Sequence, residues 1–221
     1  MAKQRREKGA KKTKRAAGAT KSGGKKTGKE RRAAAARSLE SLPLQPDDDA
    51  SLYHVVIETS KGSPNKLGYD EQLGAFTLHA VLPQGAVFPF DFGFLPQTKG
   101  GDGDPLDVLV LMQAPVAPGT VVPTRLVGVI EAEQREKSGE TVRNDRIIGV
   151  APACALYRDV EALDDLPTAA VDEIEQFFVN YERQEGKEFR PLGRGGPGQA
   201  AALVRRGTKG GGGKRARQRE R

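Results

Sequence analysis

Apolar residues in the first part of the folded chain occur in short runs separated by turn residues, a pattern typical of β-strands. We predict strands over residues 52–58, 74–81, 108–112, 121–131 and 146–151. Glycine, proline or charged clusters separate these runs. Five such strands are enough to close a small barrel.

The pattern then changes to helical spacing. Five large apolar or aromatic residues recur three or four positions apart: Val171, Ile174, Phe177, Phe178 and Tyr181. This spacing places them on one face of a helix, which we expect to pack against the barrel. Glycines over 193–198 interrupt the pattern, 199–206 predicts a last helical turn or two, and 210–213 reads as a flexible linker.

Charge divides the chain into three parts. The formal charge of the whole chain is +7, but residues 1–37 carry +13, residues 205–221 carry +7, and the part between them carries −13. The basic ends lack the apolar residues that offset the entropy of ordering, so we expect them to be disordered. We therefore predict a disordered tail and linker over 1–49, one domain over 50–204, and a basic C-terminal tail over 205–221.

Composition also limits the classes of protein. Cys154 is the only cysteine, which excludes an intramolecular disulfide and a cysteine-based zinc cluster. The sequence has no apolar run long enough to span a bilayer and no secretory signal, so we expect a cytoplasmic protein without membrane contact. The basic N-terminus also fits a transit peptide, although it is richer in Lys and Gly than in Ser.

The most informative segment is Asp102-Gly-Asp-Pro-Leu-Asp107, directly before a predicted strand. Gly103 and Pro105 favour a tight loop in which the three carboxylates converge. Two carboxylates about 5 Å apart repel by roughly 3 kcal/mol at an effective dielectric near 20, so three pairs cost on the order of 10 kcal/mol. Mg²⁺ relieves such repulsion and binds carboxylates, waters and substrate phosphates together. A solvated acidic turn fits the spacing equally well.

Other sites are less favoured by the residues. The acidic loop lacks the Gly and Glu spacing of an EF-hand, and the glycines at 193–196 lack the Lys-Ser/Thr of a Walker loop. The two histidines, His54 and His79, lie in β-patterned segments. We interpret both as ordinary strand residues rather than ligands.

The segment DGDPLDVLV, residues 102–110, resembles the Asp-x-Asp-Pro-x-Asp motif of the soluble Mg²⁺-dependent inorganic pyrophosphatases. The segments FPFDFGFLPQT, LVGVIE and FFVNY are also similar to that family, so the resemblance covers roughly residues 52–192. It implies an α+β fold: a five-stranded OB-like β-barrel with flanking C-terminal helices. It also implies hydrolysis of pyrophosphate to two phosphates with several Mg²⁺ ions, and a homo-oligomer.

The resemblance assigns metal-binding positions to this sequence. Asp102, Asp104 and Asp107 match metal-binding aspartates, and Glu58 matches an acid just outside them. Asn144 stands where the family has another metal-binding aspartate. Asp104 would also help to deprotonate the attacking water, because a metal-bridged water is acidified and needs only a nearby carboxylate.

Three further residues match groups that bind phosphate and take part in catalysis. Lys66 matches a phosphate-binding lysine, Arg146 stands in place of another lysine, and Tyr181 matches a tyrosine that donates its hydroxyl. Each also has a simpler interpretation: a solvated turn residue for Lys66, a surface strand residue for Arg146, and a core residue for Tyr181.

Several positions depart from the family pattern. An expected glutamate is Gly68, an arginine is Ala80, two tyrosines are phenylalanines, and a lysine is Glu182; the two phenylalanines are Phe88 and Phe92. Each lost charged hydrogen bond is worth roughly 1.5 to 3 kcal/mol. The loop from 131 to 145 is longer than the family's, so Glu133, Gln134 or Glu136 can align with its acids and none is assigned a role.

These observations leave three functions open. The leading hypothesis is a Mg²⁺-dependent inorganic diphosphatase, weakened by the departures. The second is a pyrophosphatase-like protein that binds phosphate without catalysis or acts on another substrate. The third is a nucleic-acid-associated protein that contacts polyanions weakly through its basic tails.

Overall fold

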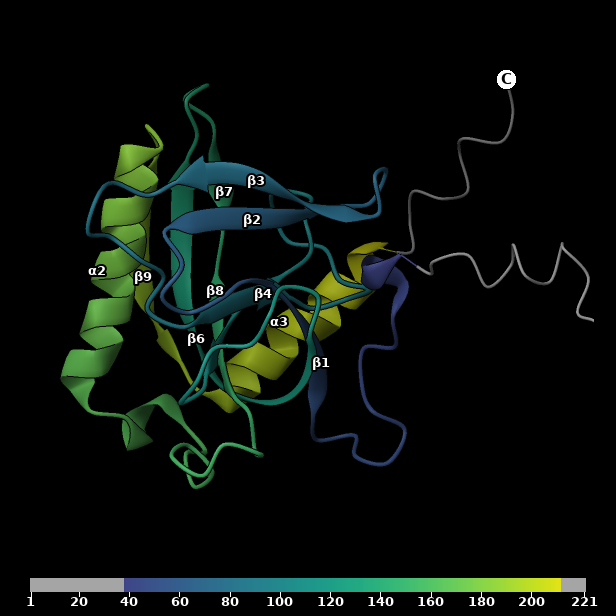
Figure 1. Cartoon of the computed structure of the whole chain (residues 1–221). Helices are drawn as coiled ribbons and strands as arrows, with labels where there is room; N and C mark the ends of the chain where they lie inside the picture. The colour runs from purple at the N-terminus through teal and green to yellow at the C-terminus, as the bar shows by residue number, and fades with distance from the viewer. Residues whose placement is uncertain (1–37, 212–221) are drawn as a thin grey trace, which may run out of the picture. The chain divides into compact units, whose positions relative to one another are not determined.

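A computed structural model of the chain describes residues 38–211 (Figure 1). Expectations for residues 1–37 and 212–221 lie outside this described part. The elements are, in order, η1 (Leu39–Ser41), β1 (Tyr53–Thr59), β2 (Asn65–Asp70), β3 (Ala75–Val81), β4 (Asp91–Phe94), β5 (Asp107–Leu111), β6 (Val121–Arg135), β7 (Thr141–Arg143), β8 (Arg146–Val150), η2 (Leu163–Asp165), α2 (Thr168–Gln184), β9 (Glu188–Gly195) and α3 (Pro197–Gly211).

Five strands pair in a closed ring in the order β1-β4-β5-β8-β6, and β6 pairs with β1 again. Neighbours in the ring are antiparallel except β5 and β8, which are parallel. Strands β7 and β9 pair with β6 outside the ring. The number of strands in the ring agrees with the sequence-based expectation.

The membership of the ring differs from that expectation. The predicted strand over 74–81 is β3, which pairs with β2 in a separate two-stranded sheet and leaves much of its surface exposed. The missing ring strand is β4, whose four residues are all buried. Its Gly93 permits a close approach, since a Cβ there would lie 2.0 Å from the Val56 carbonyl oxygen. A four-residue strand without an alternating pattern gives little signal in the sequence.

The ring strands β5 and β8 are buried on both faces, which explains their continuous apolar runs. Helix α2 packs its apolar face against one group of residues, including Leu109 and Ile148. Helix α3 packs Ala200 and Val204 against the alternate residues, including Val108. The predicted helical face on α2 is confirmed, except that Phe177 is only partly buried.

Three segments are more ordered than the sequence indicates. Residues 38–49 contain η1, and Leu44 packs against the core, so this part of the expected disordered linker is structured. The backbone N–H of Gln97 donates to the Glu40 carbonyl oxygen at 2.9 Å. Strand β9 continues to Gly195 where we expected the pattern to break, and α3 runs through the predicted boundary at 204 and the first linker glycines. Backbone pairing and the apolar face of α3 outweigh the low intrinsic propensity of glycine.

Within residues 38–211, no helix is both long enough and apolar enough to cross a membrane.

Candidate active site

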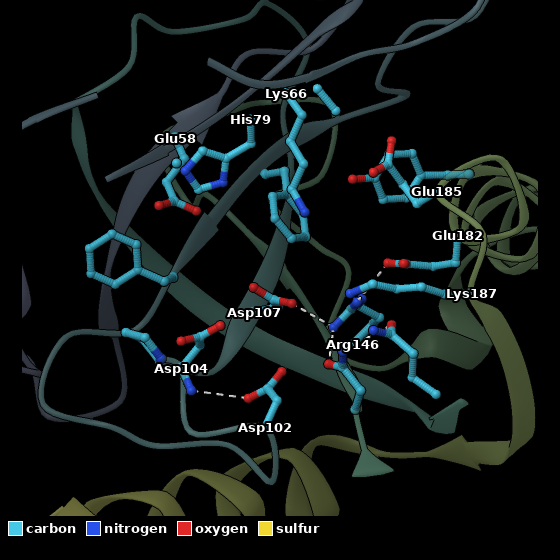
Figure 2. Close-up of a pocket in the computed structure, with 18 of the residues that line it drawn as sticks. Glu58, Lys66, His79, Asp102, Asp104, Asp107, Arg146, Glu182, Glu185 and Lys187 are labelled. Carbon is cyan, nitrogen blue, oxygen red and sulfur yellow. Dashed lines mark hydrogen bonds and ion pairs between the residues drawn. The ribbon is translucent and has the colours of Figure 1, made fainter. Parts of the chain in front are cut away.

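A cavity of about 690 Å³ opens beside the β2–β3 sheet and the ends of β5, β6 and β8 (Figure 2). All the residues assigned to the site by resemblance line it: Glu58, Lys66, Asp102, Asp104, Asp107, Asn144, Arg146 and Tyr181. They come from β1, β2, the acidic loop, β5, the turn between β7 and β8, β8 and α2. The fold therefore brings together residues that are far apart in the sequence.

The parallel pair β5–β8 positions the central charges. Asp107 is the first residue of β5 and Arg146 is the first residue of β8, and their following residues Val108 and Ile147 are register partners. Parallel strands begin at the same edge of a sheet, so the two side chains meet there. Arg146 Nη1 lies 2.5 Å from Asp107 Oδ2. Burial raises the pKa of the Asp107 carboxyl, and Arg146 opposes that rise.

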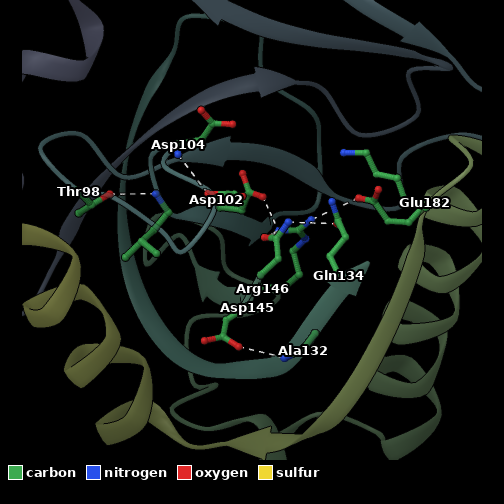
Figure 3. Close-up of polar contacts among 12 residues, drawn as sticks. Thr98, Asp102, Asp104, Ala132, Gln134, Asp145, Arg146 and Glu182 are labelled. Carbon is green, nitrogen blue, oxygen red and sulfur yellow. Dashed lines mark hydrogen bonds and ion pairs between the residues drawn. The ribbon is translucent and has the colours of Figure 1, made fainter. Parts of the chain in front are cut away.

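The acidic loop is closed by its own backbone. The N–H of Gly100 donates to the Asp104 carbonyl oxygen at 2.7 Å, and Gly103 has a φ of 95°, which favours glycine. The N–H of Asp104 donates to Asp102 Oδ1 at 3.1 Å (Figure 3). Burial raises the pKa of the Asp102 carboxyl; the hydrogen bond from the Asp104 N–H opposes this rise, and the charge of Asp104 adds to it. The loop thus holds several carboxylates close together at the start of β5.

Glu58 adds a fourth carboxyl to the same wall. Its Oε1 accepts a hydrogen bond of 2.7 Å from the N–H of Tyr69. Burial raises the pKa of Glu58 to about 7, and the charges of Asp107 and Asp104 contribute to the rise. A cation beside a carboxyl that titrates near neutral pH would stabilise its charged form.

Lys66 lies across the cavity from the acidic loop (Figure 2), and it forms a pair with Tyr181, which also lines the cavity. Lys66 Nζ lies 5.2 Å from the centroid of the Tyr181 ring. Burial lowers the pKa of Lys66, but Tyr181 and Asp107 outweigh it and leave the pKa raised, so the lysine stays charged. The Tyr181 ring is 6% exposed and also stacks on Phe177 at 5.9 Å. Its core role and its place in the cavity are therefore compatible.

Arg146 is buried, with 4% of its side chain exposed, rather than on the surface. It donates to Asp107, to the Asn144 side-chain oxygen and, at 3.4 Å, to Glu182 Oε1 (Figure 3). Its guanidinium carbon lies 5.0 Å from the Phe178 ring centroid. A buried guanidinium requires several acceptors. Asn144 and Glu182, two departures from the family pattern, supply acceptors for this arginine.

The other departures fill space with apolar groups. Phe88 and Phe92 are buried and lie 5.8 Å apart, ring centroid to centroid, beside the aromatic residues of α2. Gly68 leaves room for the ring of His79: a Cβ at position 68 would lie 2.2 Å from His79 Cε1. None of these three positions therefore brings a polar side chain of its own to the cavity.

The structure places both histidines. His79 lines the cavity, which its strand pattern did not indicate, and Gly68 across the hairpin was the one available signal. The ring of His54 instead contacts the Pro43 carbonyl oxygen through Nδ1 at 2.8 Å. His54 is not among the residues that line the cavity.

Three residues at the end of β6 and just after it could not be assigned a role from the sequence alone. Gln134 and Glu136 line the cavity. Glu133 points to the other face and pairs with Arg190 at 2.5 Å. This alternation follows from the period of two along a strand. Sequence reasoning also missed Lys187, which lines the cavity.

The residues that line the cavity favour a divalent cation. Nine acidic and three basic side chains line it, counting the described residues, so its formal charge is strongly negative. Oxygen donors of this kind suit hard cations such as Mg²⁺. Within residues 38–211 no three acidic or histidine side chains yet converge on one point. Arg146 holds Asp107, and the backbone holds Asp102, so binding a metal requires these carboxylates to turn.

Comparisons with known proteins point to one family. The model of the inorganic pyrophosphatase family matches residues 55–210. The inorganic pyrophosphatase of Thermus thermophilus is 40% identical over 151 residues, which cover 68% of this chain and 83% of the relative. A soluble inorganic pyrophosphatase of Zea mays is 37% identical over 72% of this chain and 71% of the relative.

A crystal structure of the Thermus thermophilus inorganic pyrophosphatase superposes with a TM-score of 0.72 at 35% identity. The match covers 79% of this chain and 99% of that one. Another similar structure, from Anaplasma phagocytophilum, gives a TM-score of 0.69 at 30% identity. With its acidic loop, its closed ring of strands and these matches, the chain belongs to the inorganic pyrophosphatase family.

Proposed function

We propose that this protein hydrolyses inorganic pyrophosphate to two phosphates with the help of Mg²⁺. The observation that carries the proposal is the convergence of the acidic loop with Lys66, Arg146 and Tyr181 on one cavity, in a chain of this family. Phosphoryl transfer requires mainly charge neutralisation, positioning and an oriented water, and these groups supply them.

Asp102, Asp104 and Asp107 would hold the metal, with Glu58 close by and Asn144 offering a neutral oxygen. Bound Mg²⁺ lowers the pKa of water and neutralises phosphate charge. Asp104 lies on the exposed tip of the loop, and its side chain is not held by a bond to Arg146. It is therefore free to accept a proton from the attacking water.

The basic and hydroxyl groups bind the substrate. Lys66 remains charged and lies beside the Tyr181 hydroxyl, so the two present donors to one phosphate group. Arg146 supplies positive charge beside Asp107, although its hydrogen bonds are mostly directed to protein acceptors. This site has fewer free hydrogen-bond donors for substrate than the family pattern would supply. We therefore predict weaker substrate binding, with catalysis retained.

The test is phosphate release from pyrophosphate with millimolar Mg²⁺, with EDTA as the control and a panel of other diphosphates beside it. Melting temperature is measured in parallel, because an ion that binds only the folded state raises it by mass action. We expect Mg²⁺-dependent release and a higher melting temperature. Binding of pyrophosphate without release would favour a non-catalytic phosphate-binding protein, and unchanged melting would contradict the metal site.

We also propose that residues 1–37, with a charge of +13, contact polyanions while the enzyme domain acts without them. Deleting these residues should leave pyrophosphate hydrolysis within twofold of the full chain and weaken RNA binding at low salt. Unchanged RNA affinity, or loss of hydrolysis, would contradict this division. The oligomeric state stays a prediction, which light scattering after size-exclusion chromatography tests.

A further inference from the structure

The hairpin of β2 and β3 contributes a histidine to the cavity that has no role in the proposed reaction. Gly68, His79 and Ala80 all line the cavity. Gly68 and Ala80 stand where the family pattern has a glutamate and an arginine, so this hairpin lacks two charged side chains. The imidazole of His79 is the polar group that lies between these two positions.

A β-bulge lies at His79. Lys66 pairs with Ala80, whereas the next residue of β2, Leu67, pairs with Leu78, so His79 is an extra residue in β3. Bulges change the direction of a side chain and are common beside active sites. The ring lies over Gly68, because a Cβ built at position 68 would be 2.2 Å from His79 Cε1, 2.7 Å from Nδ1 and 2.8 Å from Nε2. The ring thus occupies the space that a side chain at position 68 would need.

Both nitrogens of the His79 ring are available to a ligand. Within residues 38–211 neither nitrogen forms a hydrogen bond or an ion pair, and the side chain is exposed. A neutral imidazole has one N–H donor in either tautomer, and a charged imidazole has two. His79 can therefore donate a hydrogen bond to a molecule in the cavity without breaking a hydrogen bond to the protein.

The neighbours of the ring favour a phosphate as this ligand. Side chains alternate along a strand, so Lys66 and the His79 ring over Gly68 share one face of the hairpin. Figure 2 shows both side chains across the cavity from the acidic loop. A diphosphate held through Mg²⁺ at that loop requires donors for the oxygens that do not bind the metal, and ammonium and imidazole N–H groups are such donors.

We propose that His79 is a substrate-binding residue that donates a hydrogen bond to a phosphate oxygen of the diphosphate, beside the contact made by Lys66. It supplies a donor in place of the arginine that is missing at Ala80, the next position in β3. Gly68 belongs to the same arrangement, because the absence of a side chain there leaves room for the ring. This proposal rests on the proposed function, since it assigns a phosphate contact within the same cavity.

Four substitutions separate this contact from the fold. His79→Ala removes the ring, and His79→Gln removes the ring but keeps an N–H donor. Gly68→Ala adds a Cβ that must displace the ring, while the histidine stays in the chain. His54→Ala is the matched control, because it removes the histidine of β1, which does not line the cavity.

The experiment measures the Kd of methylene diphosphonate with excess Mg²⁺ by calorimetry, and KM and kcat for pyrophosphate. Loss of a hydrogen bond to a charged phosphate predicts about tenfold weaker binding for His79→Ala, with KM rising more than kcat falls. We expect His79→Gln to restore most of the affinity and His54→Ala to stay within about twofold of the wild type.

A double-mutant cycle tests the link between Gly68 and His79. Gly68→Ala alone should weaken binding of the analogue, because it displaces the donor. In the His79→Ala background the same substitution should change the Kd by less than about twofold, since no ring is left to displace. Equal effects of Gly68→Ala in the two backgrounds would contradict the proposed arrangement.

The ring could instead bind a metal together with Glu58, and Mn²⁺ titration without the analogue distinguishes this role. We expect His79→Ala to bind Mn²⁺ as the wild type does. Weaker Mn²⁺ binding by His79→Ala would make the ring a metal ligand and overturn the proposal. Analogue affinity of His79→Ala within twofold of the wild type would also overturn it, as would an equal loss in His54→Ala or no analogue binding by the wild type.

Urea denaturation of each variant separates a loss of folding from a loss of contact. If the wild type binds the analogue but does not hydrolyse pyrophosphate, the proposed function fails while the Kd values still decide the role of His79.

Discussion

The two walls of the cavity differ in how closely their charged residues follow the family pattern. The acidic wall consists of the loop from Asp102 to Asp107, a single segment whose residues follow the family motif at every charged position. The opposite wall takes residues from β6, β8, α2 and the turn before β9, and here several charges depart from the pattern. Both walls nevertheless line the same cavity.

The difference shows what each kind of site tolerates. A loop that gathers carboxylates requires each of them, because the metal is bound by their number and spacing. On the opposite wall the charges depend on one another: buried Arg146 requires acceptors, and Asn144 and Glu182 provide them. Such a group of charges can change as a set while each buried charge keeps a partner.

The largest effect is expected on the acidic wall. Asp104→Asn keeps the side-chain volume but removes a charge from the metal site and a proton acceptor, so turnover should fall by about 100-fold or more. Phosphate release with excess Mg²⁺ measures this, and circular dichroism checks that the fold is kept. Asp48→Asn, an exposed aspartate that does not line the cavity, is the matched control. Turnover within threefold of the wild type would place the proton acceptor elsewhere.

The opposite wall should respond in stability before it responds in rate. Glu182→Ala removes an acceptor from a buried guanidinium and should lower the free energy of unfolding by about 2 kcal/mol, less than for a fully broken buried pair because Asp107 remains. Urea denaturation at constant m-value measures the change. Glu185→Ala, on the same helix end, is the control and should change stability by less than about 0.5 kcal/mol. Equal effects would contradict the coupling of Glu182 to Arg146.

A smaller effect is expected from pH in the metal-free protein. The pKa of Glu58 is raised to about 7, so between about pH 4.5 and 7 the folded protein binds more protons than the unfolded chain. Its stability should therefore fall as pH rises through this range, by on the order of 1 to 2 kcal/mol from this half-buried group. Glu58→Gln should flatten that part of the profile, and saturating Mg²⁺ should reduce it in the wild type. An unchanged profile in Glu58→Gln would assign the slope to other carboxyls.

The acidic wall could be predicted because one short segment of the sequence contains all three of its aspartates. Asp-Gly-Asp-Pro-Leu-Asp carries the turn residues, the carboxylates and the following strand together. The apolar face of α2 could be predicted equally well, because a period of 3.6 residues is a local property of the sequence. Strand β4 could not be predicted, since its four residues form a strand because they pair with β1 and β5, not because of their own sequence pattern.

The opposite wall could not be predicted for a related reason. Glu182 looks like a lost cation until Arg146 is found 3.4 Å away, and 36 residues separate the two in the sequence. His79 looks like a strand residue until Gly68 is found beneath its ring. Lys187 lies outside the helical pattern. Contacts between distant segments, rather than local sequence, define these roles.

The parallel pairing of β5 with β8 has a consequence for folding kinetics. Asp107 and Arg146 are 39 residues apart, and β6 and β7 lie between their strands in the chain. Contacts of such high sequence separation form slowly because loop closure costs entropy in advance. The cavity is therefore completed only when the ring closes. During refolding, recovery of tight Mg²⁺ binding should lag behind recovery of helical signal, so the metal site serves as a late reporter of the native topology.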